Sequence, residues 1–278
     1  MLKLMYITNE PEIATIAENA GVDRIFVDLE YIGKDIRQAG MDTVQCHHTI
    51  EDISSIRKVI TKAELLVRCN PIHESTEEYN SSKEEIDAIA KAGADVIMLP
   101  YFKTVEEVKG FINCVNGRVK TSLLVETPEA VEIIDDILEV EGIDEVHIGL
   151  NDLSLGYGKI FMFELLTDGT VEKLCHKFEQ TNIPYGFGGI AGLGKGLLPA
   201  ELIIREHYRL GSTCAILSRS FCDANKIELN DAIRTTFEEG VKEIRKFEQE
   251  CRNTEQNFDE NSRKIEEYVK LICSNVEC

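Results

Sequence analysis

Two carboxylates come directly after apolar runs that read as buried strands. Glu126 ends the run VKTSLLVE (119–126), and Asp152 follows the run DEVHIGL (144–150). If these runs are neighbouring parallel strands, about 4.8 Å apart, both carboxylates can converge on one point. Two anions this close favour a cation between them, and carboxylate oxygens favour Mg²⁺ or Mn²⁺. A plain alternative stays open, in which each carboxylate caps the helix that follows it.

A single arginine, Arg68, ends another apolar run, LLVRCNP (65–71). A guanidinium at the end of a buried strand needs an anionic partner, and its planar fork can bind a carboxylate through two parallel hydrogen bonds. We therefore expect Arg68 to bind the carboxylate of a substrate. A structural salt bridge from Arg68 to Glu30 or Glu126 is the alternative.

The elements that must position these residues are eight apolar runs that alternate with helical patterns, as in parallel βαβ units. The strands are expected at 2–7, 24–29, 64–69, 95–100, 119–126, 144–150, 184–189 and 213–218. Segments between them, such as SKEEIDAIAKAG, carry apolar residues three and four positions apart, as amphipathic helices do. Because the helices are short and the units repeat with similar length, we predict a closed (β/α)₈ TIM barrel with an additional C-terminal helix, in preference to an open doubly wound sheet.

In such a barrel all strands end on one face, so polar residues at the strand ends are the functional candidates. Gly149 and Asn151 are candidates for substrate contact beside Asp152. The remaining candidates are Asp28, Glu30, Tyr31, Asn70, Ser218 and Arg219. The glycine-rich loop GFGGIAGLGKGLLPAE (186–201) could hold an anion ahead of a helix, although simple tight turns use glycines equally well.

The barrel is expected to fill residues 1–250 as one domain, with a helical extension at 251–278. This extension carries Ile265, Tyr268, Val269 and Ile272 at helical spacing. No strand remains for its apolar stripe to cover, so we expect it to pack in the interface of a homo-oligomer, a trimer or a hexamer.

The composition favours a small-molecule substrate. Fifty acidic residues against thirty basic ones leave a formal net charge of −20, which disfavours nucleic acid and anionic membrane as partners. The first residues lack the pattern of a secretory signal, and no apolar run approaches the length of a membrane span. We expect a cytoplasmic protein.

Five motifs, in order on successive expected strands, resemble the HpcH/HpaI aldolase and citrate lyase family. They are AGVDRIFVDLE (20–30), LLVRCNP (65–71), GADVIMLPYFKTVEEV (93–108), LLVETPEAV (123–131) and GIDEVHIGLNDLSLGYG (142–158). The resemblance implies a barrel with bound Mg²⁺ or Mn²⁺, held by Glu126 and Asp152. It also implies that Arg68 binds the carboxylate and the enolate oxygen of a pyruvate-like 2-oxo acid.

The function expected from this resemblance is that of a metal-dependent class II aldolase or carbon–carbon lyase that works through an enolate. Two alternatives remain. One is a citryl- or malyl-CoA-type lyase, which resembles this chain in having basic residues after the second strand, here Lys34 and Arg37. The other is a catalytically reduced barrel that binds an oxo-acid.

The proton-transfer residue is an open question, because the family's aldolases read Asp-x-Glu-His at strand two and this chain has Tyr31 at the histidine position. His47 and His48 follow in the loop on the same face as the metal ligands. We expect His48 to be the base beside Asp28, with His47 second, and Tyr31 or a water molecule after them. In the alternative, both histidines merely precede a helix capped by Thr49.

Overall fold

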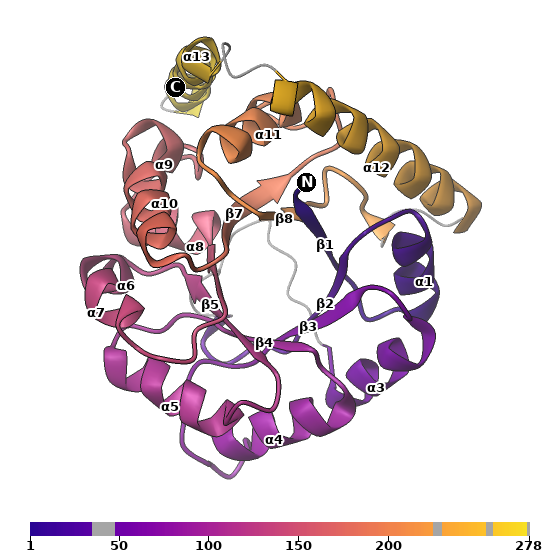
Figure 1. Ribbon diagram of the computed structural model, residues 1–278, viewed down its shortest axis with the longest axis vertical. Helices are drawn as coiled ribbons and strands as arrows, with labels where there is room; N and C mark the ends of the chain where they lie inside the picture. Colours follow the sequence, from indigo (N-terminus) through magenta and orange to yellow (C-terminus); the bar gives the residue numbers. More distant parts are fainter. Residues whose placement is uncertain (35–47, 225–229, 254–257, 277–278) are drawn as a thin grey trace.

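The barrel is closed, and its eight parallel strands follow one another in sequence order around it (Figure 1). The computed structural model describes residues 1–34, 48–224, 230–253 and 258–276. Every strand agrees with its expected range to within two residues at either end, so the prediction of a (β/α)₈ barrel is confirmed. The strands are β1 Lys3–Ile7, β2 Arg24–Asp28, β3 Glu64–Arg68, β4 Val96–Leu99, β5 Lys120–Val125, β6 Glu145–Ile148, β7 Tyr185–Ile190 and β8 Cys214–Leu217.

The helices surround the barrel, as Figure 1 shows. They are α1 Pro11–Asn19, α3 Ile50–Val59, α4 Ser82–Ala92, α5 Val105–Val115, α6 Pro128–Glu132, α7 Ile134–Leu138, α8 Leu150–Gly156, α9 Glu164–Thr167, α10 Thr170–Thr181, α11 Ala200–Arg209, α12 Asn230–Asn253 and α13 Phe258–Val276. Three consecutive helices begin with a capping box, in which the N-cap side chain and an acidic side chain three residues later each accept a backbone N–H. The boxes of α3, α4 and α5 start at Thr49, Ser81 and Thr104.

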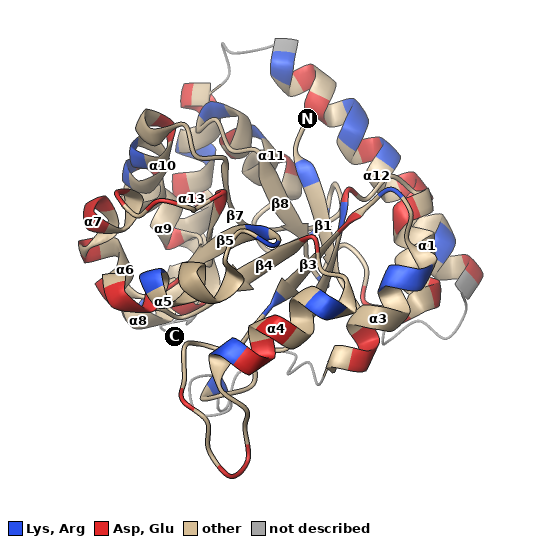
Figure 2. Cartoon of the chain, turned by 60° about the horizontal axis from the view of Figure 1, so that its bottom comes forward, with Lys and Arg blue, Asp and Glu red and all other residues tan. Residues whose placement is uncertain are grey.

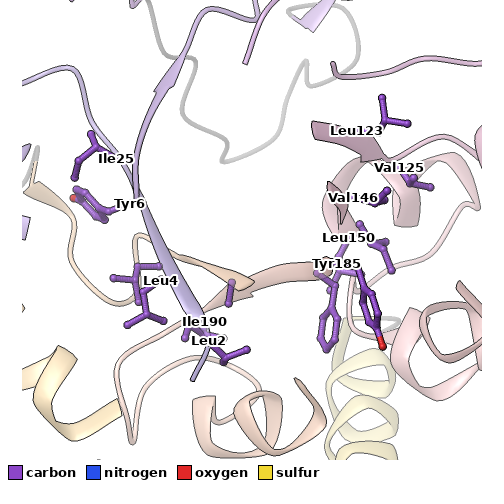
Figure 3. Close-up of a cluster of buried hydrophobic side chains, with 14 of the residues drawn as sticks. Leu2, Leu4, Tyr6, Ile25, Leu123, Val125, Val146, Leu150, Tyr185 and Ile190 are labelled. Carbon is purple, nitrogen blue, oxygen red and sulfur yellow. The ribbon is translucent and has the colours of Figure 1, made fainter. Parts of the chain in front are cut away.

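Side chains alternate between two layers along each strand, because successive strand residues point to opposite faces. Outward residues pack under the helices in the larger hydrophobic cluster, parts of which Figure 3 shows along β1 and along β5 to β7. Inward residues form a smaller cluster inside the barrel, which includes Phe26, Leu66 and Leu124. The inward residue two positions after each of these three is Asp28, Arg68 and Glu126, respectively. The same alternation therefore turns the candidate site residues into the mouth of the barrel.

The opposite end of the barrel is filled by an ionic cluster around Arg24. Its wholly buried guanidinium donates to Glu64 on β3 at 2.7 Å and, across the interior, to Glu145 on β6 at 2.9 Å. Lys3 and Lys120 flank Glu64 at 2.6 and 2.8 Å. These charges lie at the amino ends of the strands, where residues of a TIM barrel serve stability.

The two C-terminal helices pack on the chain's own barrel. α12 lies against α1 and α11, and runs three residues past the boundary expected at residue 250; α13 lies against α11 and α9 (Figure 1). In α13, Ile265 and Val269 are buried, whereas Tyr268 and Leu271 are exposed. The apolar stripe is thus partly covered within one chain, by helices and not by a strand. The homo-oligomer stays a prediction.

The outer surface carries charges of both signs. Figure 2 shows acidic and basic residues interspersed over outer helices such as α4 and α12. No helix in the described part of the chain is long and apolar enough to cross a membrane.

Candidate active site

A cavity of about 470 Å³ opens where the strands end, which is a size typical of small-molecule sites. Its wall includes residues from β1, β2, β3, β5, β6, β7 and β8 or the loops that follow them. Most of the described candidates line it: Asp28, His48, Arg68, Glu126, Gly149, Asn151, Asp152, Ser218 and Arg219. Glu30, Tyr31 and Asn70, which the sequence also singled out, are not part of its wall. His47 and Arg37 lie outside the described residues.

Asp28 and Arg68 meet because β2 and β3 pair them in register, both facing inward. Arg68 donates from Nε and Nη2 to the two oxygens of Asp28, at 2.8 and 2.7 Å. Its Nη1 lies 3.2 Å from Glu30. The expected alternative of a salt bridge to Glu30 is therefore present, but the main partner is Asp28. Burial raises the pKa of Asp28, yet the Arg68 and Lys34 charges outweigh burial and hold this pKa well below its usual value.

Lys34 completes a group of two cations and two carboxylates. Its buried Nζ lies 2.8 Å from Asp28 and 3.5 Å from Glu30. The loop between β2 and Lys34 is held by Asn70, whose side-chain oxygen accepts the backbone N–H groups of Tyr31 and Ile32 at 3.0 Å each. Asn70 is thus a positioning residue for this loop.

His48 reaches the cavity from the start of α3. Its Nδ1 accepts the backbone N–H of Asp28 at 3.0 Å. The Thr49 capping box is also present, so helix capping and a place for His48 in the cavity wall occur together. Burial lowers the pKa of His48, opposed by the charges of Asp28 and Asp52 and assisted by those of Lys34 and Arg68. The net effect favours the neutral ring.

Glu126 is almost wholly buried, and a neighbouring residue with a left-handed backbone conformation helps to orient it. Tyr101, with φ of 49°, donates its backbone N–H to Glu126 Oε1 at 3.0 Å. On the other side, a Cβ at Gly149 would lie 2.8 Å from Glu126 Oε2. The amide of Gly149 already donates to the Val125 carbonyl oxygen at 2.9 Å. Gly149 therefore contributes space for Glu126 at this point of the wall.

Asp152 is half-buried in the first turn of α8, next to the exposed Asn151. Neither carboxylate caps a helix. Thr127 caps α6 by accepting the Ala130 N–H, and the N-cap of α8 is Gly149, which makes no side-chain bond. The capping alternative was wrong for both carboxylates.

The charges of the cavity wall suit a divalent cation. Within the described ranges no three His, Cys, Asp or Glu side chains form a metal-binding group, so Glu126 and Asp152 would be a two-carboxylate site. Mg²⁺ commonly binds one or two carboxylates and keeps several waters. The described wall carries five carboxylates against three cations: Glu10, Asp28, Glu126, Asp152 and Asp223 against Lys34, Arg68 and Arg219. This excess of negative charge and the hard oxygen donors fit Mg²⁺ or Mn²⁺.

The glycines of the loop at 186–201 serve close packing and turns. A Cβ at Gly186 would lie 2.2 Å from the Cys214 carbonyl oxygen, and the β7–β8 register shifts between Gly186 and Gly189. The Gly194 amide donates to Glu201 at 2.8 Å. These contacts support the tight-turn interpretation of the loop.

Sequence reasoning missed several residues of the cavity wall, among them Thr8, Asn9 and His147. Thr8 and Asn9 follow β1, so the strand-end rule applied to the first strand would have found them. His147 is an inward residue of β6, and strand alternation alone could have indicated its position. Its Nε2 lies 3.3 Å from the Gly188 carbonyl oxygen, and its Nδ1 lies 3.7 Å from Cys214 Sγ.

Two buried histidines should make the protein sensitive to acid. Burial lowers the pKa of His147 to about 4, and burial with the nearby His147 lowers that of His207 to about 3. The unfolded chain takes up these protons below about pH 6.5, whereas the native protein takes them up only near its lowered values. Each histidine therefore makes its full contribution to the free energy of unfolding above about pH 6.5. This contribution falls as the pH is lowered, by up to about 1.4 kcal/mol per pH unit.

His207→Gln is the variant that tests this, because His207 packs on Phe187 at a ring distance of 3.9 Å, outside the cavity wall. Urea unfolding between pH 7 and 4.5 gives the free energy of unfolding as a function of pH. Near pH 5, the slope of this curve should be smaller in the variant than in the wild type, by the amount that corresponds to about one bound proton. Equal slopes would show that His207 is not neutral in the native protein.

Comparison with known proteins points to one family. The sequence model of the HpcH/HpaI aldolase/citrate lyase family matches residues 3–160, more than half of the chain. No curated protein sequence matches the chain. Among solved structures, an HpcH/HpaI aldolase from Desulfitobacterium hafniense DCB-2 superposes with a TM-score of 0.58 at 18% identity, over 88% of this chain and 93% of the other.

Two further structures are similar to the same extent. A HpcH/HpaI aldolase/citrate lyase family protein from Burkholderia cenocepacia J2315 has a TM-score of 0.60 at 15% identity, covering 88% of this chain and 94% of its own. The citrate synthase SbnG has a TM-score of 0.59 at 16% identity, covering 85% and 93%. At such low identity these structures establish a shared fold.

Proposed function

The chain belongs to the HpcH/HpaI aldolase/citrate lyase family, and from this premise we propose that it is a divalent-metal-dependent carbon–carbon lyase or aldolase for a small 2-oxo acid. One observation carries the proposal. Glu126, Asp152 and Arg68, which come from three different strand ends, line a single cavity of about 470 Å³. Two carboxylates for a cation and a guanidinium for an anion are what such a substrate requires.

The metal site would consist of Glu126 and Asp152. A bound Mg²⁺ or Mn²⁺ supplies a Lewis acid that stabilises negative charge on the oxygen of the oxo group. The Tyr101 amide holds Glu126 by donating to Oε1, and the absence of a side chain at Gly149 leaves room for Oε2.

Arg68 would bind the carboxylate of the oxo-acid. Its Nε and Nη2 are held by Asp28, and Nη1 lies near Glu30, so the guanidinium is fixed before a substrate arrives. A donor held in advance needs no reorganisation when charge develops on the substrate. Apolar residues of the wall, among them Ile148, Leu150 and Met162, limit the water around the reacting carbons.

The test is proton exchange at the methyl group of pyruvate, which requires an enolate but not knowledge of the second substrate. We expect the methyl signal to decay in D₂O, followed by NMR, when Mg²⁺ or Mn²⁺ is present. EDTA should stop the decay, and added Mn²⁺ should restore it. Exchange no faster than in the EDTA control would reject the enolate mechanism.

A further inference from the structure

We propose that His48 is a hydrogen-bond donor to a substrate oxygen, through Nε2–H, and not the base of the reaction. This inference rests on the proposed function for the identity of the substrate, a small oxo-acid. It concerns the loop histidine, which occupies no position of the strand-two motif.

The contact with β2 determines which nitrogen of His48 carries the proton. A backbone N–H can only donate, and the amide of Asp28 donates to Nδ1 at 3.0 Å. Nδ1 must therefore keep its lone pair. A neutral imidazole has one proton, which consequently sits on Nε2.

This arrangement is held from both sides of the contact. The Asp28 carboxylate is bound by Arg68 and Lys34, at 2.7 and 2.8 Å, so the end of β2 is fixed. On the other side, the Thr49 capping box fixes the backbone that follows His48. For His48 to take up a proton at Nδ1, the bond to the Asp28 amide would have to break and two N–H groups would face each other.

The other edge of the ring is then available for a substrate. His48 is part of the cavity wall together with Arg68 and Lys34. Burial of the ring disfavours the imidazolium and lowers the pKa of His48; Asp28 and Asp52 oppose this, and the charges of Lys34 and Arg68 assist it. No group in the described part of the chain bonds to Nε2. A neutral donor beside a guanidinium is suited to an oxygen on which negative charge develops.

Three substitutions separate a donor from a base. His48→Gln carries an amide N–H near the position of Nε2, His48→Asn reaches only to the position of Nδ1, and His48→Ala has neither. For a donor, we expect metal-dependent pyruvate exchange to fall about 100- to 1,000-fold in the Asn and Ala variants, and to stay within about tenfold of wild type in the Gln variant. Equal losses in all three variants would overturn the proposal, because glutamine cannot act as a base. Wild-type exchange in all three would also overturn it.

A second measurement does not depend on the reaction. In the long-range ¹H–¹⁵N spectrum of the full chain labelled with ¹⁵N-histidine, His48 is identified by the signals that disappear in His48→Gln. At pH 7.5 we expect an unprotonated Nδ1 and a protonated Nε2. The opposite tautomer, or a charged ring, would overturn the proposal whether or not the wild type catalyses exchange. Absence of exchange in the wild type would instead reject the proposed function.

Discussion

Glu126→Gln and Asp152→Asn are each expected to weaken Mn²⁺ binding by more than about 100-fold, and to abolish metal-dependent pyruvate exchange. Replacing a residue that hydrogen-bonds to a metal ligand typically lowers metal affinity by about 10- to 100-fold. These variants remove an anionic ligand itself, so the loss should be larger. Glutamine can still accept the Tyr101 N–H, and Asp152 caps no helix, so the barrel should remain folded. Mn²⁺ titration followed by electron paramagnetic resonance measures the affinity, and thermal unfolding checks the fold.

Glu129→Gln is the matched control for this experiment. Glu129 lies in α6, three residues beyond Glu126, and its largely exposed carboxylate pairs with Lys103. Removing it takes away one negative charge close to the cavity without touching the proposed ligands. We expect its Mn²⁺ affinity to equal that of the wild type. Undiminished affinity in both ligand variants would disprove the metal site.

Arg68→Ala should affect both stability and catalysis. The change removes a cation from the buried Asp28 and Glu30 carboxylates, which Lys34 still contacts, and breaking a buried ion pair costs about 3–5 kcal/mol. Pyruvate exchange should fall by on the order of 100- to 1,000-fold, as for other losses of a fixed donor. Arg68→Lys should recover part of the stability but little of the exchange, because an ammonium lacks the planar fork.

Lys103→Ala provides the comparison for stability. Its ion pair with Glu129 has both side chains more than two-fifths exposed, and such surface pairs contribute about 0–1 kcal/mol. Urea unfolding of the three variants should therefore rank Arg68→Ala lowest and Lys103→Ala close to wild type. A loss below about 1 kcal/mol in Arg68→Ala would contradict the structural role of the Arg68–Asp28 contact.

The barrel was predictable from the sequence because its signals are local. Buried parallel strands are short apolar runs, and the capping boxes at Thr49 and Thr104 mark the helix starts within four residues. Glu126 and Arg68 were then indicated because a polar residue at the carboxyl end of a barrel strand lies at the face where the functional loops meet.

The partners of these residues were harder to predict, because pairing depends on register across strands. Asp28 meets Arg68 through the alignment of β2 with β3, and Gly149 makes room for Glu126 from the next strand. The contact of His48 with the Asp28 amide depends on where a loop returns to the barrel. The C-terminal helix was correct as an element, but its packing surface on α11 and α9 could not be derived from its own periodicity.

The Arg24 cluster has a consequence for the order in which a growing chain can fold. Arg24 leaves the ribosome with β2, and Glu64 follows with β3, but Glu145 belongs to β6 and emerges roughly 120 residues after Arg24. Until then the guanidinium has one of its two carboxylate neighbours, in an interior that tolerates a charge only when it is paired. The first half of the chain alone would therefore hold Arg24 with Glu64 but without Glu145, and we expect it to be less stable for that reason. The cluster is complete only once β6 has been synthesised, and the barrel can close only with β8, which pairs with β1.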